Sequence, residues 1–402
     1  MIRIRSAAQS YAWGSPTAIP ELLGLPVTGE PVAEAWFGSH HAGPSPVDDD
    51  TDGGSAARTL VDAIAGDPRR ALGEDVVARF GARLPYLLKI IAAETPLSLQ
   101  VHPNLAAAAE GFDREDAAGI PVDAPHRNYR DRNHKPELVY ALTRFEAVCG
   151  FRAPRRAAEL LVGLDAPLAK ELHDLLFAQR DASGIEAAFT QLLDPATRPG
   201  PDEVQQVVDA CARRLADGSP SPRADRTVVR LAEAYPGDPG VVTSLLLNPV
   251  TLHPGEALFV PAGGVHAYLS GVGVEIMASS DNVLRAGLTP KHVDVAELLR
   301  NVDYVAAPPI RIAPERFHGA TRVYYAPVDD FELSITSVED AGAHPLPGRG
   351  PRVLLCLEGE ATVRAASGAS VALRRGDAAF VPASDGTLEV EGCARLVQAD
   401  VP

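Results

Sequence analysis

Cysteine is scarce in this chain of 402 residues, and its spacing excludes several kinds of site. The four cysteines lie far apart, and no two of them form a C-x-x-C pair: Cys149, Cys211, Cys356 and Cys393. Disulfide frameworks are typical of small, cysteine-dense secreted domains, and thiolate metal sites are built from paired cysteines. The spacing therefore favours reduced thiols in a cytoplasmic protein.

Long apolar runs are also missing. No stretch approaches the ~20 consecutive apolar residues that a transmembrane helix needs. The N-terminal residues MIRIRSAAQSYAWG contain no apolar signal core. We therefore expect no membrane partner and a cytoplasmic location.

Positive charge is in deficit, because the formal net charge is -16 at pH 7. A general anionic field repels phosphate backbones, so the composition argues against a nucleic-acid partner. It does not exclude a small anionic ligand, provided that the binding site gathers cations locally.

Lysine is especially rare. Only four of the 37 basic residues are lysines: Lys89, Lys135, Lys170 and Lys291. Arginine and lysine differ in geometry, hydration and ease of pKa shift. If arginine has replaced most surface lysines, the remaining lysines are candidates for positions that require an amine. For any single lysine, chance is an equally good explanation.

The spacing of apolar residues changes twice along the chain, from a strand pattern to a helical pattern and back. Residues 1–152 contain short apolar runs between turns, as in RLPYLLKIIAAETPLSLQVHPN, which we interpret as strands. Residues 153–232 carry Leu, Val and Ala at helical spacing and predict a helical insert. Strand patterning returns over 233–310, where VDVAELLRNV predicts one short helix, and continues in a further unit over 311–402. We expect a mainly β protein in which 1–152 and 233–310 form one domain around the insert.

One strand-and-turn stretch occurs twice. GEALFVPAG (255–263) and GDAAFVPAS (376–384) share a glycine turn, a buried strand and a Pro-Ala turn, which predicts two jelly-roll modules. The first copy continues to His266, whereas the second has no histidine after it. We therefore expect one metal per chain, with nothing bound beside Val381–Ser384.

Four residues offer nitrogen and oxygen ligands from three predicted strands of the first module. In SLQVHPN, Gln100 and His102 lie two apart and share a strand face. In NHKPEL, Lys135 and Glu137 share a face and His134 points to the other, and His266 follows the strand ALFVP. Two imidazoles, a carboxylate and an amide suit a borderline divalent ion, for which zinc is the usual choice. A lone strand histidine is more often structural, and His134 is an alternative to Gln100.

Residues 274–294, VEIMASSDNVLRAGLTPKHVD, gather polar and basic side chains close behind His266. They include Asp281, Asn282, Arg285, Lys291 and His292. An alternative interpretation of the segment is a surface loop in which Thr289 caps a helix beginning at Pro290. Such a helix N-terminus beside Arg285 and Lys291 would suit a phosphate group.

These motifs together resemble the type I mannose-6-phosphate isomerases, which are zinc-dependent cupins. The resemblance lies in PLSLQVHPN, NHKPEL, GEALFVPAGGVHAYLSG and VEIMASSDNVLRAGLTPKHVDV, with YAWGS and AEAWFGSH near the start. It implies two cupin-type jelly-roll modules with a helical domain. It implies zinc ligation by Gln100, His102, Glu137 and His266. It also implies catalytic roles for Arg285, Lys135 and Glu275, and a substrate pocket that includes Lys291, Lys89, Ser98, Trp13 and Asp281.

The implied reaction moves a proton between C2 and C1 of a sugar phosphate through a cis-enediol(ate). Zinc with an open position polarises the carbonyl as a Lewis acid, and Arg285 can stabilise the developing charge. Arginine is a poor base because its pKa exceeds about 12. Four residues are candidates for the proton carrier: Lys135, His134, Glu275 and Asp281.

Two other functions fit part of the sequence. A cupin oxygenase would use iron, but such sites favour histidine-rich or two-His-one-carboxylate ligand sets. A non-catalytic, sugar-binding protein built of two cupin modules would hold an inert metal or none. The amide ligand and the clustered cations favour the isomerase, which we expect to be a monomer with a small-molecule sugar phosphate as its partner.

Overall fold

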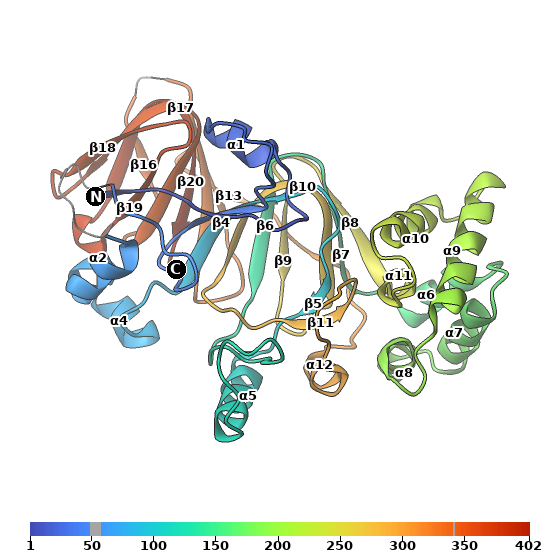
Figure 1. The fold of residues 1–402 in the computed structure, drawn as a ribbon. Coiled ribbons are helices and arrows are strands. Elements are labelled where there is room, and N and C mark those ends of the chain that lie inside the picture. The colour runs from blue at the N-terminus through green and yellow to red at the C-terminus, as the bar shows by residue number, and fades with distance from the viewer. Residues whose placement is uncertain (49–57, 341) are drawn as a thin grey trace.

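The computed structural model describes residues 1–48, 58–340 and 342–402 and contains two antiparallel β-sheets (Figure 1). The C-terminal sheet lies at one end of the molecule, and the helices of the insert lie at the other. The predicted architecture, two jelly-roll modules with a helical segment, is confirmed.

The first sheet has 11 strands, of which seven follow the order β12-β9-β6-β10-β4-β3-β2. The strands on this path are β12 (Ile310–Ile312), β9 (Ala257–Val260), β6 (Glu137–Ala141), β10 (His266–Ala278), β4 (Tyr86–Ala93), β3 (Glu34–Phe37) and β2 (Ala7–Gln9). The other four are β5 (Leu99–Val101), β7 (Phe145–Phe151), β8 (Leu247–Leu252) and β11 (Leu284–Gly287).

Strand β10 folds this sheet over on itself. Its first residues pair with β5 and β7, its last residues pair with β4 and β6, and the register shifts between Tyr268 and Ser270. A bulge increases the local twist and bends a strand. The long strand β10 therefore contributes to both layers, and its N-terminal end pairs with β5.

The C-terminal sheet has nine strands, seven of them in the order β1-β19-β17-β20-β15-β14-β13. They are β1 (Ile2–Ile4), β19 (Ala378–Val381), β17 (Arg352–Ala365), β20 (Leu388–Asp400), β15 (Glu332–Val338), β14 (Thr321–Tyr324) and β13 (Glu315–Phe317), and β16 (His344–Leu346) and β18 (Ser370–Arg374) pair outside this path.

The strand-and-turn stretch that occurs twice takes equivalent places in the two sheets. In each copy a fully buried four-residue strand, β9 or β19, lies between a short edge strand and a longer inner strand. The first copy lies between β12 and β6, and the second between β1 and β17. The interpretation as one architectural unit used twice agrees with this placement.

A single apolar core joins the two sheets. Leu138, Tyr140 and Ile276 of the first sheet belong to the same buried cluster as Leu333 and Phe380 of the second. The packed faces exclude water from both sheets, and this burial is the main stabilising contribution to their association. Each β module therefore stabilises the other.

The remaining regular elements are helices and 3₁₀ turns. Those of the insert are α6 (Pro154–Leu161), α7 (Pro167–Ala178), α8 (Ala182–Leu193), α9 (Pro201–Ala216) and α10 (Pro222–Ala234), followed by α11 (Gly240–Thr243) and the 3₁₀ turn η1 (Ser244–Leu246). The later ones are α12 (Val295–Asn301) and the 3₁₀ turn η2 (Ala383–Asp385). None of the helices in the described residues is long and apolar enough to cross a membrane.

The first 150 residues also contain helices, so our interpretation of this region as strands was incomplete. They are α1 (Ala18–Leu23), α2 (Leu60–Gly66), α3 (Pro68–Leu72), α4 (Glu74–Phe80) and α5 (Leu105–Ala117). The signal for α5 was present, because the Asn104 side chain accepts a hydrogen bond from the Ala107 N–H at 2.9 Å before an alanine-rich run.

Two strands connect regions that we assigned to different domains. Strand β1, at the start of the chain, pairs with β19 of the C-terminal sheet, and β12, at residues 310–312, pairs with β9 of the first sheet. The division at 1–152, 153–232, 233–310 and 311–402 remains a proposal.

Candidate metal centre

Three strand ends bring the predicted ligand residues together. His102 directly follows β5, Glu137 is the first residue of β6, and His266 is the first residue of β10. Gln100 of β5 lies directly opposite His266 in the antiparallel pairing. The expected convergence of His102, Glu137 and His266 is confirmed: one ligand atom from each lies within 4.8 Å of the others.

Backbone carbonyl groups set the orientation of both imidazoles. Nδ1 of His102 lies 2.8 Å from the carbonyl oxygen of Asn282, and Nδ1 of His266 lies 3.0 Å from that of Gly264. A carbonyl oxygen only accepts hydrogen bonds, so each neutral ring carries its hydrogen on Nδ1 and a lone pair on Nε2. The second nitrogen of metal-binding histidines is typically held in this way.

Both Nε2 atoms face the same carboxylate. Nε2 of His102 lies 3.2 Å from Oε1 of Glu137, and Nε2 of His266 lies 3.4 Å from Oε2. The first contact lacks hydrogen-bond geometry, and His102 Nε2 is buried without a hydrogen-bond partner. Lone pairs aimed at a carboxylate repel it unless a cation lies between them, so this donor set fits a divalent metal ion.

Electrostatics favour the protonation states of His102 and Glu137 that a metal ion requires. Burial, with a smaller contribution from Lys135, lowers the pKa of His102 to about 4, so its imidazole is neutral at pH 7. Burial alone would raise the pKa of Glu137. The opposing contributions, of which the charge of Lys135 is the largest, outweigh burial and hold this pKa well below its usual range, so Glu137 is ionised.

Gln100 has an amide oriented by a neighbour. Its Nε2 donates to Oγ of Ser98 at 3.3 Å, which leaves the carbonyl oxygen available as a ligand. His134, the alternative fourth ligand, points away and pairs with Asp330 at 2.9 Å. The buried Cys149 lies opposite His266, and burial raises the pKa of this thiol to about 12, so it offers no thiolate.

A pocket of about 800 Å³ opens beside this group. Its lining includes eight of the predicted site residues: Trp13, Lys89, Ser98, Gln100, Lys135, Asp281, Arg285 and Lys291. Glu275 lies behind Lys89, with its Oε2 3.0 Å from Lys89 Nζ. Lys135 connects the pocket to the metal-binding group, because its Nζ lies 3.2 Å from Oε1 of Glu137.

Cations concentrate in one part of the pocket lining. Burial, together with the charges of Arg285 and Arg130, lowers the pKa of Lys291. Burial and Arg130 likewise lower the pKa of Arg285. Our sequence analysis missed Arg130, although the arginines of HRNYRDRNHKPEL precede the metal motif. Three basic side chains close enough to affect one another form a suitable subsite for a dianion.

The buried Asn282 holds Arg130 and His102 in place. Its Oδ1 accepts a hydrogen bond from the Arg130 N–H at 2.7 Å, and its Nδ2 donates to the carbonyl oxygens of Asp131 and Asn133, each at 2.8 Å. Its own carbonyl oxygen accepts from His102. Asn282 therefore links the two parts of the site, since its backbone carbonyl holds His102 and its side-chain amide holds the Arg130 backbone.

The predicted helix beginning at Pro290 is wrong. Residues 289–292 form a turn in which Oγ1 of Thr289 accepts from the Lys291 N–H at 3.1 Å. The helix begins later, at Val295, and Asp294 caps it by accepting from the Glu297 N–H. Aspartate is the better N-cap of the two residues, which explains the shift. The N-terminus of this helix therefore lies four residues beyond Lys291 and not at Pro290.

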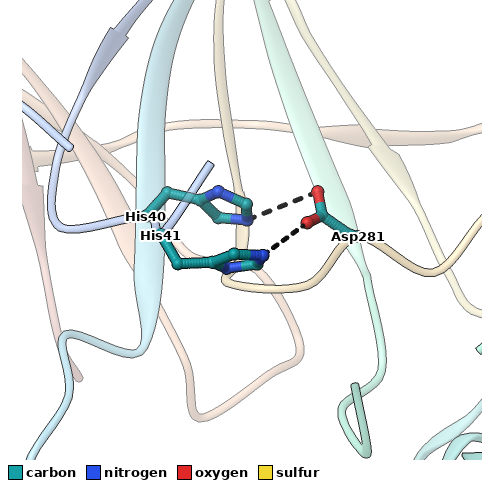
Figure 2. Close-up of side chains that lie close together, drawn as sticks. All are labelled: His40, His41 and Asp281. Atoms are coloured by element: carbon teal, nitrogen blue, oxygen red, sulfur yellow. Dashed lines mark ion pairs between the residues drawn. The ribbon is translucent and has the colours of Figure 1, made fainter. Parts of the chain in front are cut away.

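A second histidine group, which no sequence motif indicated, consists of His40, His41 and Asp281 (Figure 2). Two of its members, His40 and Asp281, line the pocket. Nε2 of His40 lies 3.5 Å from one carboxylate oxygen of Asp281, and Nε2 of His41 lies 3.1 Å from the other. The sequence signal for this group was weak, because only Glu34 and Trp36 lie at alternate positions and His40 follows four residues after Trp36.

The tautomer of His40 distinguishes this group from the metal-binding group. Nδ1 of His40 accepts a hydrogen bond from the Ala42 N–H at 3.3 Å, so the ring hydrogen lies on Nε2 and faces Asp281. Burial is the main cause that lowers the pKa of His40 to about 4, which keeps this ring neutral. His40 therefore presents a hydrogen, and not a lone pair, to Asp281.

Comparisons with known proteins agree over the whole chain. Residues 1–154 match the family model of the catalytic domain of type I phosphomannose isomerase, and residues 321–401 match the mannose-6-phosphate isomerase cupin domain. The mannose-6-phosphate isomerase of Escherichia coli strain K12 is 39% identical over 99% of both chains. The Rattus norvegicus enzyme is 32% identical over 94% of this chain and 93% of its own.

Solved structures give the same result. The apo mannose 6-phosphate isomerase of Salmonella typhimurium matches with a TM-score of 0.87 at 37% identity, covering 99% of this chain and 98% of that one. A mannose 6-phosphate isomerase bound with zinc and yttrium matches with the same score, identity and coverage.

Proposed function

The chain belongs to the type I mannose-6-phosphate isomerases, and from this premise we propose that it is a zinc-dependent enzyme that interconverts mannose 6-phosphate and fructose 6-phosphate through a cis-enediol(ate). The observation that carries the proposal is the pair of imidazoles, His102 and His266, whose Nε2 atoms face Glu137 beside a pocket lined with cations.

One zinc ion per chain would be held by Gln100, His102, Glu137 and His266. These residues supply two imidazole nitrogens, a carboxylate and an amide oxygen, and no competing thiolate. When bound, zinc would polarise the sugar carbonyl group as a Lewis acid. The zinc-bound relative of known structure supports this choice of metal.

Arg285 and Lys135 perform the chemistry that remains for the protein. Arg285 lies opposite Gln100 on paired strands and stabilises negative charge that develops on the substrate oxygens. Lys135 lines the pocket and contacts Glu137, so it is placed to move a proton at the reacting carbons. Glu275 acts through Lys89, because it contacts that amine and lies outside the lining.

The substrate phosphate occupies the cationic part of the lining, where Lys291 is joined by Arg130. Trp13, Ser98, Lys89 and Asp281 line the rest of the pocket and bind the sugar. The four acidic groups Glu34, Glu137, Glu275 and Asp281 would repel a dianion, which favours placing the phosphate beside the arginines. We further propose that the enzyme acts as a cytoplasmic monomer.

The test is direct. The purified protein is incubated with mannose 6-phosphate, with and without a chelator, and the formation of fructose 6-phosphate is measured. We expect product only in the metal-loaded protein, with recovery when zinc is restored. Oxygen consumption in the presence of iron, without isomerisation, would support the oxygenase instead. Binding of the sugar without turnover would support the non-catalytic protein.

A further inference from the structure

A second cavity lies in a different part of the molecule. It has a volume of about 380 Å³ and shares no residue with the pocket beside the metal-binding group. Its lining comes from the C-terminal sheet and from one residue of the first sheet, and consists of Tyr140, Arg316, Gly319, Ala320, Arg322, Ile335, Ser337, Glu339 and Arg395. Cavities of a few hundred Å³ are large enough for small-molecule ligands.

Two arginines of this cavity face each other across neighbouring strands. Arg316 of β13 is the direct cross-strand partner of Arg322 of β14. Like charges in this position destabilise a strand pair. Among the residues that the structure describes, neither guanidinium has a carboxylate in ion-pair range or a hydrogen-bond acceptor. A bound anion would remove this repulsion.

A third arginine reaches the cavity from β20 and is held by the other β module. Arg395 lies opposite Ser337 on β15, and its Nη2 donates to the Tyr140 hydroxyl at 2.6 Å. Its Nη1 also lies 3.4 Å from the exposed carboxylate of Glu358. Tyr140 belongs to β6, the strand that begins at Glu137, but its side chain belongs to the core on the opposite sheet face. Both modules therefore build this cavity.

The charge of the lining is positive, because three arginines face the single carboxylate of Glu339. The chain as a whole carries a net charge of -16, and its overall field repels anions. The three arginines of the lining are therefore a local exception to the charge of the protein. The planar guanidinium fork binds two oxygens of a phosphate group at once, and a phosphate group carries more negative charge than a carboxylate, which suits a lining with three arginines.

We propose that this cavity is a second binding site for a phosphate group, separate from the pocket of the isomerase. The phosphate would lie between Arg316, Arg322 and Arg395 and would join the two modules at their contact through Tyr140. This assigns the C-terminal module, which carries none of the proposed zinc ligands, a binding role of its own.

The experiment is calorimetric titration of the full chain with inorganic phosphate, and with chloride at equal ionic strength. The wild-type protein is compared with the Arg316→Gln/Arg322→Gln double variant. The matched control is Arg374→Gln, an exposed arginine of the same sheet that pairs with Glu360 outside the cavity. We expect the double variant to lose one class of phosphate site, with binding there at least tenfold weaker, and the control to match the wild type.

Turnover separates this site from the sugar pocket. We expect kcat and KM for mannose 6-phosphate to stay within twofold of wild type in the double variant. The shape-conserving Glu339→Gln substitution removes the opposing charge and should tighten phosphate binding severalfold. The proposal is overturned by unchanged phosphate binding in the double variant, by an equal response to chloride, by a KM that rises in parallel with the lost binding, or by weaker or unchanged binding in Glu339→Gln.

Discussion

Lys89 lies directly opposite Glu275 on the paired strands β4 and β10, with Nζ of the lysine 3.0 Å from Oε2 of the glutamate. A second carboxylate, Glu34, lies 3.8 Å from the same amine, and the Trp36 ring lies 5.3 Å from it. All of these side chains are buried. Burial alone would lower the pKa of Lys89, but the charges of Glu275 and Glu34 outweigh it and raise this pKa. The amine stays protonated.

The first prediction concerns Lys89→Met. Removing the amine leaves two buried carboxylates without their cation, which typically costs about 3–5 kcal/mol of unfolding free energy. Urea unfolding of the metal-loaded protein measures the loss. Lys170→Met, which changes an exposed lysine of α7, should stay within about 0.5 kcal/mol of wild type. Adding Glu275→Gln to Lys89→Met should restore part of the loss, and equal stability of Lys89→Met and wild type would contradict the argument.

The second prediction concerns the metal. His266→Ala removes one nitrogen ligand and Gln100→Ala removes the amide, so both variants should lose zinc and activity together. For His266→Ala we expect a loss of about 100-fold or more in turnover, because the Lewis acid is lost. Metal analysis of the purified proteins, set beside turnover, checks this. His344→Ala is the control, since His344 pairs with Asp340 in the C-terminal module. Full activity in metal-free protein would eliminate the metal mechanism.

The third prediction concerns Arg285. Replacing it by alanine removes a charge that acts on the transition state, so we expect kcat to fall by about 10²–10³-fold. The melting temperature should change little, because the side chain lines the pocket. Arg132→Ala, which removes an exposed arginine paired with Asp113, should leave kcat unchanged. If melting collapses in proportion to activity in Arg285→Ala, the residue is structural.

The sequence predicted the convergence of His102, Glu137 and His266, because part of the information is local. Pro103 and Pro136 restrict the residues before them, His102 and Lys135, to extended backbone. The alternation of strand faces then places Glu137 on the same face as Lys135. His134 follows the same rule in the other direction and pairs with Asp330. The meeting of β5, β6 and β10 needs the whole fold, and the resemblance to a known family supplied it.

The misses have a common physical origin. His40, Arg130 and Glu34 come from segments whose side chains converge only through long-range strand pairing, and no short motif encodes that pairing. The helix expected at Pro290 was wrong because Asp294 offers a stronger cap four residues later. The cavity between Arg316, Arg322 and Arg395 also depends on strand register, which the sequence alone does not specify.

The last prediction concerns the pH dependence of stability. Burial raises the pKa of Asp400 to about 8, although Arg352 and the Val401 N–H oppose the shift and Glu332 adds to it. In the unfolded chain an aspartate titrates near 3.9. Between these values the folded state holds a proton that the unfolded state releases, so the stabilising contribution of this group is present at low pH. It is lost as the pH rises toward 8.

Asp400→Asn should remove this pH dependence while it keeps the neutral shape that Asp400 has below pH 8. Urea unfolding at pH 5, 6.5 and 8 should show the variant gaining on wild type as the pH rises, by up to about 1.4 kcal/mol per pH unit. Glu332 and the buried Tyr86 and Arg352 beside it are present in both proteins, so their titration cancels in the comparison. Asp181→Asn, which changes an exposed aspartate whose pKa is lowered by hydrogen bonds from Ser183, should run parallel to wild type over this range. Parallel curves for Asp400→Asn and wild type would mean that the buried carboxylate is already ionised at pH 5, with Arg352 neutralising it fully.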